Sequence, residues 1–184
     1  MRPIAYPSAS AVAHMSNILS SSASRQRIQA TTPIAPPIAP HLAAREAGTV
    51  IDFAVLDRAY ERLRMQSEVL IVEGAGGWRV PLDAERDFAD LAARWELQIV
   101  LVVGLRLGCL NHALLTIEAI ERCGLQVYGW VANGIDPDFE RAADNVETLR
   151  RRIAAPCLAV LGFAPDADAA SIARELTVGL RPAI

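Results

Sequence analysis

The sequence contains no lysine, since all 18 of its basic residues are arginine. A phosphate-binding loop of the form G-x-x-x-x-G-K-[ST] therefore does not occur in it, because that motif uses a lysine to bind phosphate. The motifs G-x-S-x-G, H-E-x-x-H and G-x-G-x-x-G do not occur either. These absences argue against a serine hydrolase, a metalloprotease and an ordinary dinucleotide-binding protein.

Cysteine is also scarce. The three cysteines, Cys109, Cys123 and Cys157, have no paired spacing that would suit a metal site. Such a sparse, odd-numbered set is typical of reduced thiols in a cytoplasmic protein, and we interpret Cys123 and Cys157 as small buried hydrophobic residues. We predict no signal peptide, because Pro3 and Pro7 interrupt the first residues and no continuous apolar core follows a basic region there.

Long hydrophobic runs and an excess of one charge are absent as well. No apolar run approaches the roughly 18 residues that span a bilayer, so we expect no membrane segment. The net charge is -3, with acidic and basic residues mixed along the chain, which argues against a nucleic-acid partner. Yet 52% of the 184 residues are hydrophobic. This composition fits one compact domain with a buried sheet.

Residues 1–48 differ from the rest of the chain. Serine is enriched over residues 16–24, and prolines cluster over residues 32–40. Serine clusters compete with regular structure through local hydrogen bonds, and closely spaced prolines disfavour helices and central strands. We therefore expect residues 1–48 to form an irregular segment, with one short helix near residues 9–19. This segment is expected to pack on a domain formed by residues 49–184.

From residue 49 onward, helical and strand-like patterns alternate. The spacing of apolar residues predicts helices over 52–64, 87–96, 110–122 and 140–153, with Asp52 capping the first and Gly124 ending the third. Short apolar runs predict buried strands over 69–72, 99–103, 127–132 and 157–161. Strands of this kind, separated by helices, predict an α/β fold in which helices cover both faces of a parallel sheet. Ligands bind such sheets at the carboxyl ends of the strands.

Glu73 directly follows the first predicted strand, and Gly74, Gly76 and Gly77 come after it. In nucleotide-hydrolysing α/β proteins, an acid at this point holds Mg²⁺ beside the phosphates. The glycines allow backbone N–H groups to approach an anion closely. A glycine-rich turn with a solvated acid gives the same pattern, and this simpler interpretation is favoured when the motif is considered alone.

Two further segments follow predicted strands. Residues 107–112 open a helix, whose free N–H groups and positive dipole end attract a carboxylate or phosphate. Alternatively, Asn111 simply caps this helix and His112 is a structural residue on its flank. Asn133 offers the donor and acceptor that read an adenine edge. An asparagine before Gly134 is also a common turn residue, so these segments taken singly leave the function open.

Four segments together resemble the dethiobiotin synthetases. They are residues 72–78 with Pro81 and Leu82 after them, residues 102–116, residues 129–133 and residues 36–41. The resemblance covers most of the chain after the serine-rich stretch. It implies a fold like that of the P-loop NTPases, without the first strand, phosphate loop and helix with which members of the family begin.

The resemblance implies an ATP- and Mg²⁺-dependent ligase of biotin biosynthesis that is a cytoplasmic homodimer. Such an enzyme carboxylates 7,8-diaminopelargonic acid with CO₂, phosphorylates the carbamate and closes the ring of dethiobiotin. Glu73 would bind Mg²⁺, and the start of the 110–122 helix would bind the substrate carboxylate across the dimer interface. The ATP-binding residues implied are Glu73, Gly74, Ala75, Gly76, Asn133, Gly134, Pro165, Asp166 and Ala167, and the substrate-binding residues are Gly108, Cys109, Leu110 and Asn111.

Several features depart from the family pattern. Arg2 stands where the family has a catalytic lysine, and its planar guanidinium does not replace a point donor well. A second Mg²⁺-binding aspartate is expected soon afterwards, but residues 8–24 contain no acid. The acid expected late in the adenine loop corresponds at best to Asp168.

We therefore expect a homologue of dethiobiotin synthetase whose 184-residue chain forms no dethiobiotin on its own. Two alternatives stay open. The chain could be a non-catalytic dimerisation or binding module that keeps the start of the 110–122 helix, or a related ATPase with another substrate. Residues 107–116 argue against the second alternative, because they match the family's substrate interface rather than a general nucleotide site.

Overall fold

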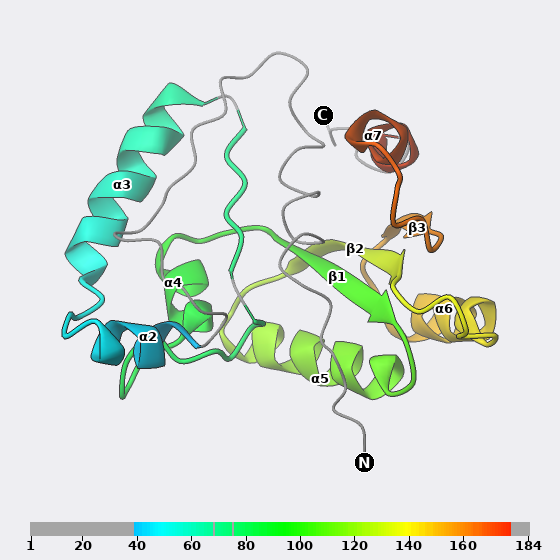
Figure 1. The fold of residues 1–184 in the computed structure, drawn as a ribbon, viewed down its shortest axis with the longest axis horizontal. Helices are drawn as coiled ribbons and strands as arrows, with labels where there is room; N and C mark the ends of the chain where they lie inside the picture. The colour runs from blue at the N-terminus through cyan, green and yellow to red at the C-terminus, as the bar shows by residue number, and fades with distance from the viewer. Residues whose placement is uncertain (1–38, 68, 75, 178–184) are drawn as a thin grey trace. The chain divides into compact units, whose positions relative to one another are not determined.

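The computed structural model describes residues 39–67, 69–74 and 76–177. The chain divides into two compact units between Leu91 and Ala92. The described elements, in chain order, are helices α2 (Pro40–Glu46), α3 (Phe53–Gln66) and α4 (Phe88–Arg94), strand β1 (Ile99–Leu105), helix α5 (Cys109–Arg122), strand β2 (Val127–Gly134), helix α6 (Ala142–Arg152), strand β3 (Cys157–Leu161) and helix α7 (Ala169–Thr177) (Figure 1). None of these helices is long and apolar enough to cross a membrane.

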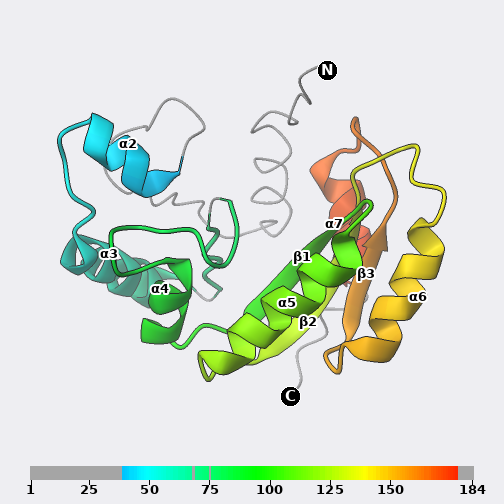
Figure 2. The same cartoon turned by 90° about the horizontal axis from the view of Figure 1, so that it is seen from below.

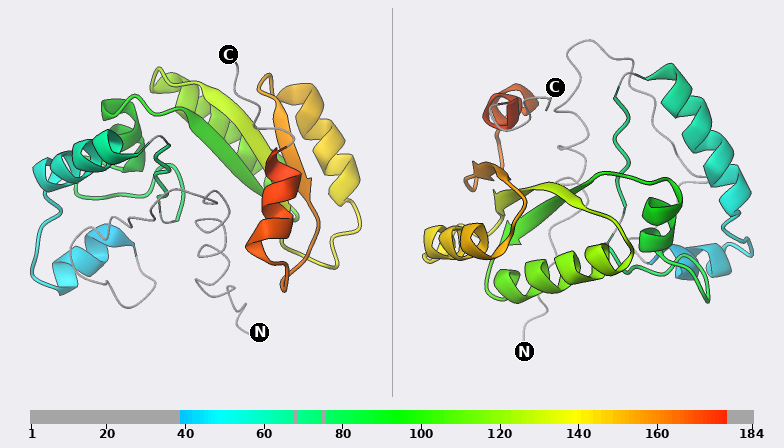
Figure 3. Two further views of the ribbon diagram at one scale, coloured as in Figure 1. Left: turned by 90° about the horizontal axis from the view of Figure 1, so that it is seen from above. Right: turned by 180° about the vertical axis from the view of Figure 1, so that it is seen from behind.

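The second unit is built on a three-stranded parallel sheet of order β1-β2-β3. Helices α5 and α6 lie along one face of this sheet, as the view from below shows (Figure 2). Helix α7 lies on the other face, beside β3 (Figure 3). The predicted α/β fold with a parallel sheet and helices on both faces is confirmed.

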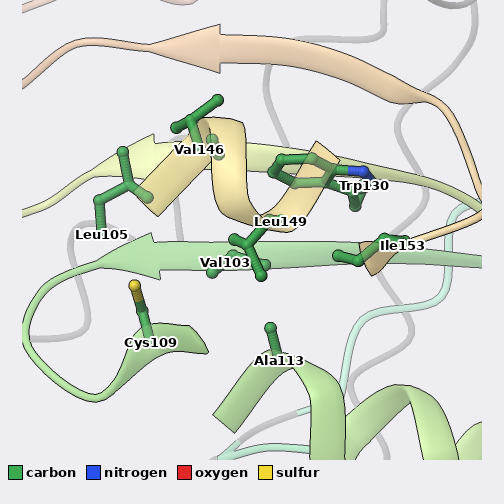
Figure 4. Close-up of a cluster of buried hydrophobic side chains, with 9 residues drawn as sticks. Val103, Leu105, Cys109, Ala113, Trp130, Val146, Leu149 and Ile153 are labelled. Atoms are coloured by element: carbon green, nitrogen blue, oxygen red, sulfur yellow. The ribbon is translucent and has the colours of Figure 1, made fainter. Parts of the chain in front are cut away.

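The core of the second unit lies between the sheet and the helices α5 and α6. Figure 4 shows Val103 of β1 facing Ala113 of α5, with Leu149 of α6 and Trp130 of β2 packed in the same cluster. Trp130 and Leu149 are completely buried. Each packed side chain of this size contributes about 1.5–3 kcal/mol of hydrophobic stabilisation, so this cluster holds the unit together.

A close approach between β2 and β3 needs a glycine. The side chain of Leu158 fills the space beside Gly129, so that a Cβ at residue 129 would lie 2.6 Å from Leu158 Cγ. Carbon atoms do not pack at that distance, so the Leu158 side chain or the backbone would have to shift if residue 129 had a side chain.

The first unit contains a small antiparallel turn over residues 79–88. Pro81 and Asp87 form a β-bridge, and the N–H of Phe88 donates to the carbonyl of Val80 over 3.2 Å. This turn contacts both earlier helices. Nδ1 of His41 in α2 lies 3.1 Å from the carbonyl oxygen of Pro81. The guanidinium of Arg86 lies 3.6 Å from the centre of the Phe53 ring at the start of α3. The turn therefore organises the unit through polar contacts and one cation–π contact.

The strand predicted over residues 69–72 does not form, and that prediction is wrong. These residues have no regular structure. The side chains of Val69 and Ile71 are 72% and 54% exposed, where the prediction required burial on both faces. A strand is stabilised by hydrogen bonds to a neighbour, and within the described residues no strand pairs with this segment.

The other predicted elements form with small shifts at their ends. β1 continues through Gly104 to Leu105, and β2 continues through Asn133 to Gly134, so both strands run past the predicted ends. Asp52 caps α3 as predicted, since its Oδ1 accepts the N–H of Ala54 over 2.8 Å. Gly124 has the expected left-handed conformation after α5, with φ of 76°.

Two helices were not predicted. Helix α2 forms over residues that the sequence placed in the irregular segment, because a proline at the start of a helix needs no N–H partner. Helix α7 begins after Asp168. The rest of the expected N-terminal segment, including the short helix near residues 9–19, lies outside the described residues.

Candidate functional site

The carboxyl ends of the three strands meet at one edge of the sheet. Gly104 of β1 pairs with Asn133 of β2, which in turn pairs with Leu161 of β3. The residues that follow these strands therefore start side by side, as the sequence predicts for a ligand-binding edge. Asn133 is half-buried, and its backbone is fixed by the ladders on both sides.

Gly134 lies against the backbone that follows β3. A Cβ at this position would stand 2.7 Å from the backbone nitrogen of Phe163 and 3.0 Å from the carbonyl oxygen of Leu161. Because these neighbours are backbone atoms, they cannot turn away as a side chain can. The structure thus brings Asn133 and Gly134 directly beside the start of the loop that carries Pro165, Asp166 and Ala167.

That loop ends in a well-defined helix start. The N–H of Ala167 donates to the carbonyl of Ala164 over 3.1 Å, which closes a turn. Oδ1 of Asp168 accepts the N–H of Ser171 over 2.7 Å, and so Asp168 caps α7. Pro165 and Asp166 are exposed beside this turn. Asp168, the loose match to the family's adenine-loop acid, has a structural role here.

The start of α5 lies at the same edge of the sheet. Gly108 is the N-cap, in the left-handed conformation with φ of 91°, so the interpretation of Asn111 as the cap is wrong. The first turn bond of the helix runs from the N–H of His112 to the carbonyl of Gly108. The backbone N–H groups of Leu110 and Asn111 precede that bond and point toward the helix start, where they suit an anion.

Two of the four residues at this helix start turn their side chains inward. Cys109 is 4% exposed and belongs to the core, with Sγ 3.7 Å from Oδ1 of Asn145 in α6. Leu110 packs against the same core. Asn111 is exposed. A ligand at this end of α5 would therefore contact backbone N–H groups and the Asn111 amide, rather than the side chains of Cys109 and Leu110.

Glu73 and its glycines belong to the first unit. Glu73 is exposed. Gly76 and Gly77 have φ of 90° and 128°, a region that residues with a Cβ rarely adopt. The Gly74 Cα faces the ring of Phe88, and a Cβ would lie 3.3 Å from that ring. These conformations explain why glycine stands at residues 76 and 77, and the binding of an anion by this segment stays a prediction.

The sequence did not predict one charged pair in the first unit, formed by Asp83 and Arg86. Arg86 donates through Nε to Oδ2 of Asp83 over 2.7 Å, and the backbone N–H groups of Glu85 and Arg86 donate to Oδ1. These hydrogen bonds, first of all the one from the Arg86 side chain, lower the pKa of Asp83 to about 2. The spacing of an aspartate and an arginine three residues apart before a helix is the signal that could have predicted this contact.

The residues present fit a magnesium ion that is coordinated mainly by nucleotide phosphates and water. Mg²⁺ in nucleotide sites is bound through one or two carboxylates, water and the phosphates themselves. Glu73 supplies one exposed carboxylate, and Gly76 and Gly77 after it have positive φ. Over the described ranges, no three histidine, cysteine, aspartate or glutamate side chains gather at one point. The two remaining predicted site residues, Arg2 and Ala75, lie outside these ranges.

The chain is similar to known proteins over most of its length. A sequence profile described as an AAA domain matches residues 1–171. Three relatives are each named ATP-dependent dethiobiotin synthetase BioD. The relative from Aromatoleum aromaticum is 54% identical over 140 residues, which is 76% of this chain and 62% of the relative. The relative from Xanthomonas oryzae pv. oryzae is 49% identical over 140 residues, which again is 76% of this chain and 62% of the relative.

The third relative, from Pseudomonas aeruginosa, is 51% identical over 149 residues, which is 80% of this chain and 64% of the relative. This chain thus spans less than two thirds of the length of the relatives that it matches.

Proposed function

We propose that this chain carries the base-binding and substrate-binding half of a dethiobiotin synthetase. The premise is that the chain belongs to the AAA domain family and, within it, to the dethiobiotin synthetases. The reaction is the ATP-dependent conversion of 7,8-diaminopelargonic acid and CO₂ to dethiobiotin in biotin biosynthesis. The close approach of Gly134 to the backbone of residues 161–163 carries this proposal, because it sets Asn133 beside the 165–167 loop.

The adenine base binds at the carboxyl ends of β2 and β3. The Asn133 amide offers a donor and an acceptor, which match the N6 amino group and ring nitrogen of adenine. Pro165, Asp166 and Ala167 form the other wall of this base site, beside Gly134. Two aligned hydrogen bonds to the base distinguish ATP from GTP, since guanine reverses the donor and the acceptor at these positions.

The substrate carboxylate binds at the start of α5. Unpaired backbone N–H groups and the helix dipole stabilise a carboxylate there, and the Asn111 amide adds a donor. Leu107 beside this site is 92% exposed, and Leu115 further along α5 is 54% exposed. We place a second copy of the chain against these leucines, so that the protein is a cytoplasmic homodimer and the substrate lies near the interface.

Glu73 holds Mg²⁺ at the phosphates, and the glycine turn of Gly74, Ala75 and Gly76 lies near them. When bound, the ion would neutralise negative charge on the phosphates. The protein's own contribution is the carboxylate of Glu73 and the backbone N–H groups of the turn.

The 184-residue chain on its own forms no dethiobiotin. It has no lysine, and Arg2 stands at the position that resembles the family's catalytic lysine. Removing one preorganised charged donor from a transition state costs about 2.7–4 kcal/mol, and the lack of several lowers the rate by many powers of ten. Turnover from diaminopelargonic acid, bicarbonate and Mg-ATP that disappears in Glu73→Ala would overturn this part of the proposal.

Calorimetric titration with ATP, GTP and diaminopelargonic acid tests the two binding sites separately. We expect Asn133→Ala to weaken ATP binding by at least about tenfold and to leave diaminopelargonic acid binding unchanged. Asn111→Ala is the matched control, because it removes the same amide from the other site and should weaken only diaminopelargonic acid binding. Equal ATP affinity in Asn133→Ala and the unmodified chain would show that the base binds elsewhere.

A further inference from the structure

Gly104, near the end of β1, leaves room for a side chain that follows β2. A Cβ at residue 104 would lie 2.6, 3.4 and 3.9 Å from Cδ1, Cγ1 and Cγ2 of Ile135. The side chain of Ile135, the first residue after β2, therefore fills the place that a side chain of residue 104 would take. Glycine is needed here for space and not for its backbone conformation, because Gly104 does not have a positive φ.

The Asn133 side chain lies on the same face of the sheet as this contact. Val103 and Ala132 point into the core that α5 and α6 cover (Figure 4). Side chains alternate along a strand, so the next residues, Gly104 and Asn133, face the other side of the sheet. These two residues are also ladder partners. Neighbouring strands lie about 4.8 Å apart, so the Ile135 side chain over Gly104 stands beside the side chain of Asn133.

Packing is what can hold the Asn133 amide in one position. The ladders on both sides fix the backbone of Asn133, but among the described residues no hydrogen bond holds its side-chain amide. Rotation about χ1 would carry this amide between staggered positions. Ile135 is branched at Cβ and therefore stiff, and it is 38% exposed, so most of its surface is packed. A stiff apolar side chain beside the half-buried amide restricts that rotation.

We propose that Ile135, seated on Gly104, is a positioning residue that sets the preference for adenine over guanine. The proposal rests on the proposed function, in which the Asn133 amide binds the base. With the amide held in one position, its two hydrogen bonds to the N6 amino group and the ring nitrogen of adenine align together. GTP gains nothing from this alignment, because guanine presents the donor and the acceptor in the opposite order.

Calorimetric titration of the full chain with ATP and with GTP tests this role. In Ile135→Ala we expect ATP to bind at least about fivefold more weakly and GTP to bind within about twofold of the unmodified chain. General damage to the site would weaken both nucleotides equally. Val100→Ala is the matched control, since it shortens an aliphatic side chain that is 44% exposed near the other end of β1. It should leave both affinities within about twofold.

A compensating pair of substitutions tests the contact itself. Gly104→Ala places a methyl group against the end of the Ile135 side chain and displaces it, so this variant should lose the same preference for ATP. Ile135→Val removes Cδ1, the atom at 2.6 Å, and leaves the carbons at 3.4 and 3.9 Å, which are ordinary contact distances. Gly104→Ala combined with Ile135→Val should therefore recover the ATP preference to within about twofold of the unmodified chain.

NMR spectroscopy of the chain without nucleotide tests the packing independently of ATP binding. We expect nuclear Overhauser effects between the Asn133 side-chain amide protons and the Ile135 δ1 methyl group. The couplings that report χ1 of Asn133 should be those of a single rotamer in the unmodified chain. In Ile135→Ala and in Gly104→Ala they should become averaged over several rotamers.

Three outcomes would overturn the proposal. One is an unchanged ratio of ATP to GTP affinity in Ile135→Ala, whether both affinities stay or both fall equally. Another is failure of the compensating pair to recover the preference for ATP. The third is an Asn133 side chain that keeps a single rotamer in Ile135→Ala. If the unmodified chain binds no ATP, the proposed function fails, and the couplings of Asn133 decide whether Ile135 holds the amide.

Discussion

Residues 69–72 and residues 99–105 are two apolar runs of similar composition with different structures. Both are rich in valine, leucine and isoleucine. The second run forms β1, where Val103 is 5% exposed, whereas Val69 in the first run is 72% exposed and has no regular structure. The difference lies in their neighbours. β1 has β2 beside it and α5 below it, and strand formation follows from that pairing rather than from the residues alone.

Matched valine substitutions give the largest expected contrast between these two runs. Val103→Ala should lower the free energy of unfolding by about 2–3 kcal/mol, because it removes two buried carbons and leaves a cavity in the core. Val69→Ala should change it by less than about 0.5 kcal/mol, because the side chain is already in water. Urea denaturation followed by circular dichroism measures both, and equal losses would show that residues 69–72 are buried in solution.

A pair of glycines tests whether backbone contact or mere flexibility is needed at the sheet edge. Gly134→Ala should cost about 1–3 kcal/mol and abolish ATP binding, because the new Cβ meets the backbone of Phe163. Gly162→Ala is the neighbouring control, since nothing lies within 4 Å of its added Cβ. We expect it to bind ATP normally. Loss of ATP binding in both variants would point to loop flexibility instead of the close contact.

Loss of the helix cap should lower the free energy of unfolding by a similar amount in the two units, whereas the two apolar runs should differ. Asp52→Ala removes the cap of α3 and Asp168→Ala removes the cap of α7. Each should cost about 1 kcal/mol in thermal or urea unfolding, because a capping bond depends on local geometry. Asp→Asn at each position is the control that retains a capping oxygen. A much larger loss at Asp168 would mean that this carboxylate also contacts the 165–167 loop.

The smallest expected effect is a pH dependence confined to the 79–88 turn. The pKa of Asp83 is lowered to about 2 from the ordinary 3.8. A lowered pKa in the folded state stabilises the turn above pH 3.8, and this contribution is lost as the pH falls through about 2. NMR titration of the Asp83 carboxyl carbon should therefore give a midpoint near 2. In Arg86→Gln the midpoint should rise toward 3.8, whereas an unchanged midpoint would exclude the Arg86 hydrogen bond as the main cause.

Much of the second unit was predictable because its elements are specified by nearby residues. The helical spacing before Arg122 and the left-handed Gly124 after it fixed the end of α5 within one residue. The strand order placed Asn133 beside the loop after β3, as expected for a parallel sheet. The family could also be predicted from the sequence, since each motif that identifies it is a continuous run of residues.

Other features depend on contacts that a local pattern does not contain. Residues 69–72 form no strand because no strand pairs with them in the part of the chain that the structure describes, and their own composition cannot show this. Gly108, rather than Asn111, caps α5, because the backbone reaches the helix through a left-handed residue. The inward orientation of the Cys109 side chain could not be predicted either, since it depends on where α6 packs.

The contact between Gly129 and Leu158 has a consequence for how the sequence of this protein can change during evolution. Any side chain at residue 129 collides with Leu158, so a variant at residue 129 alone is disfavoured. Replacing Leu158 by a smaller residue first would open the space. Substitutions at these two positions should therefore arise in a fixed order, with residue 158 changing before residue 129, although 28 positions separate them in the chain. Substitutions in β2 and β3 are therefore coupled at this contact.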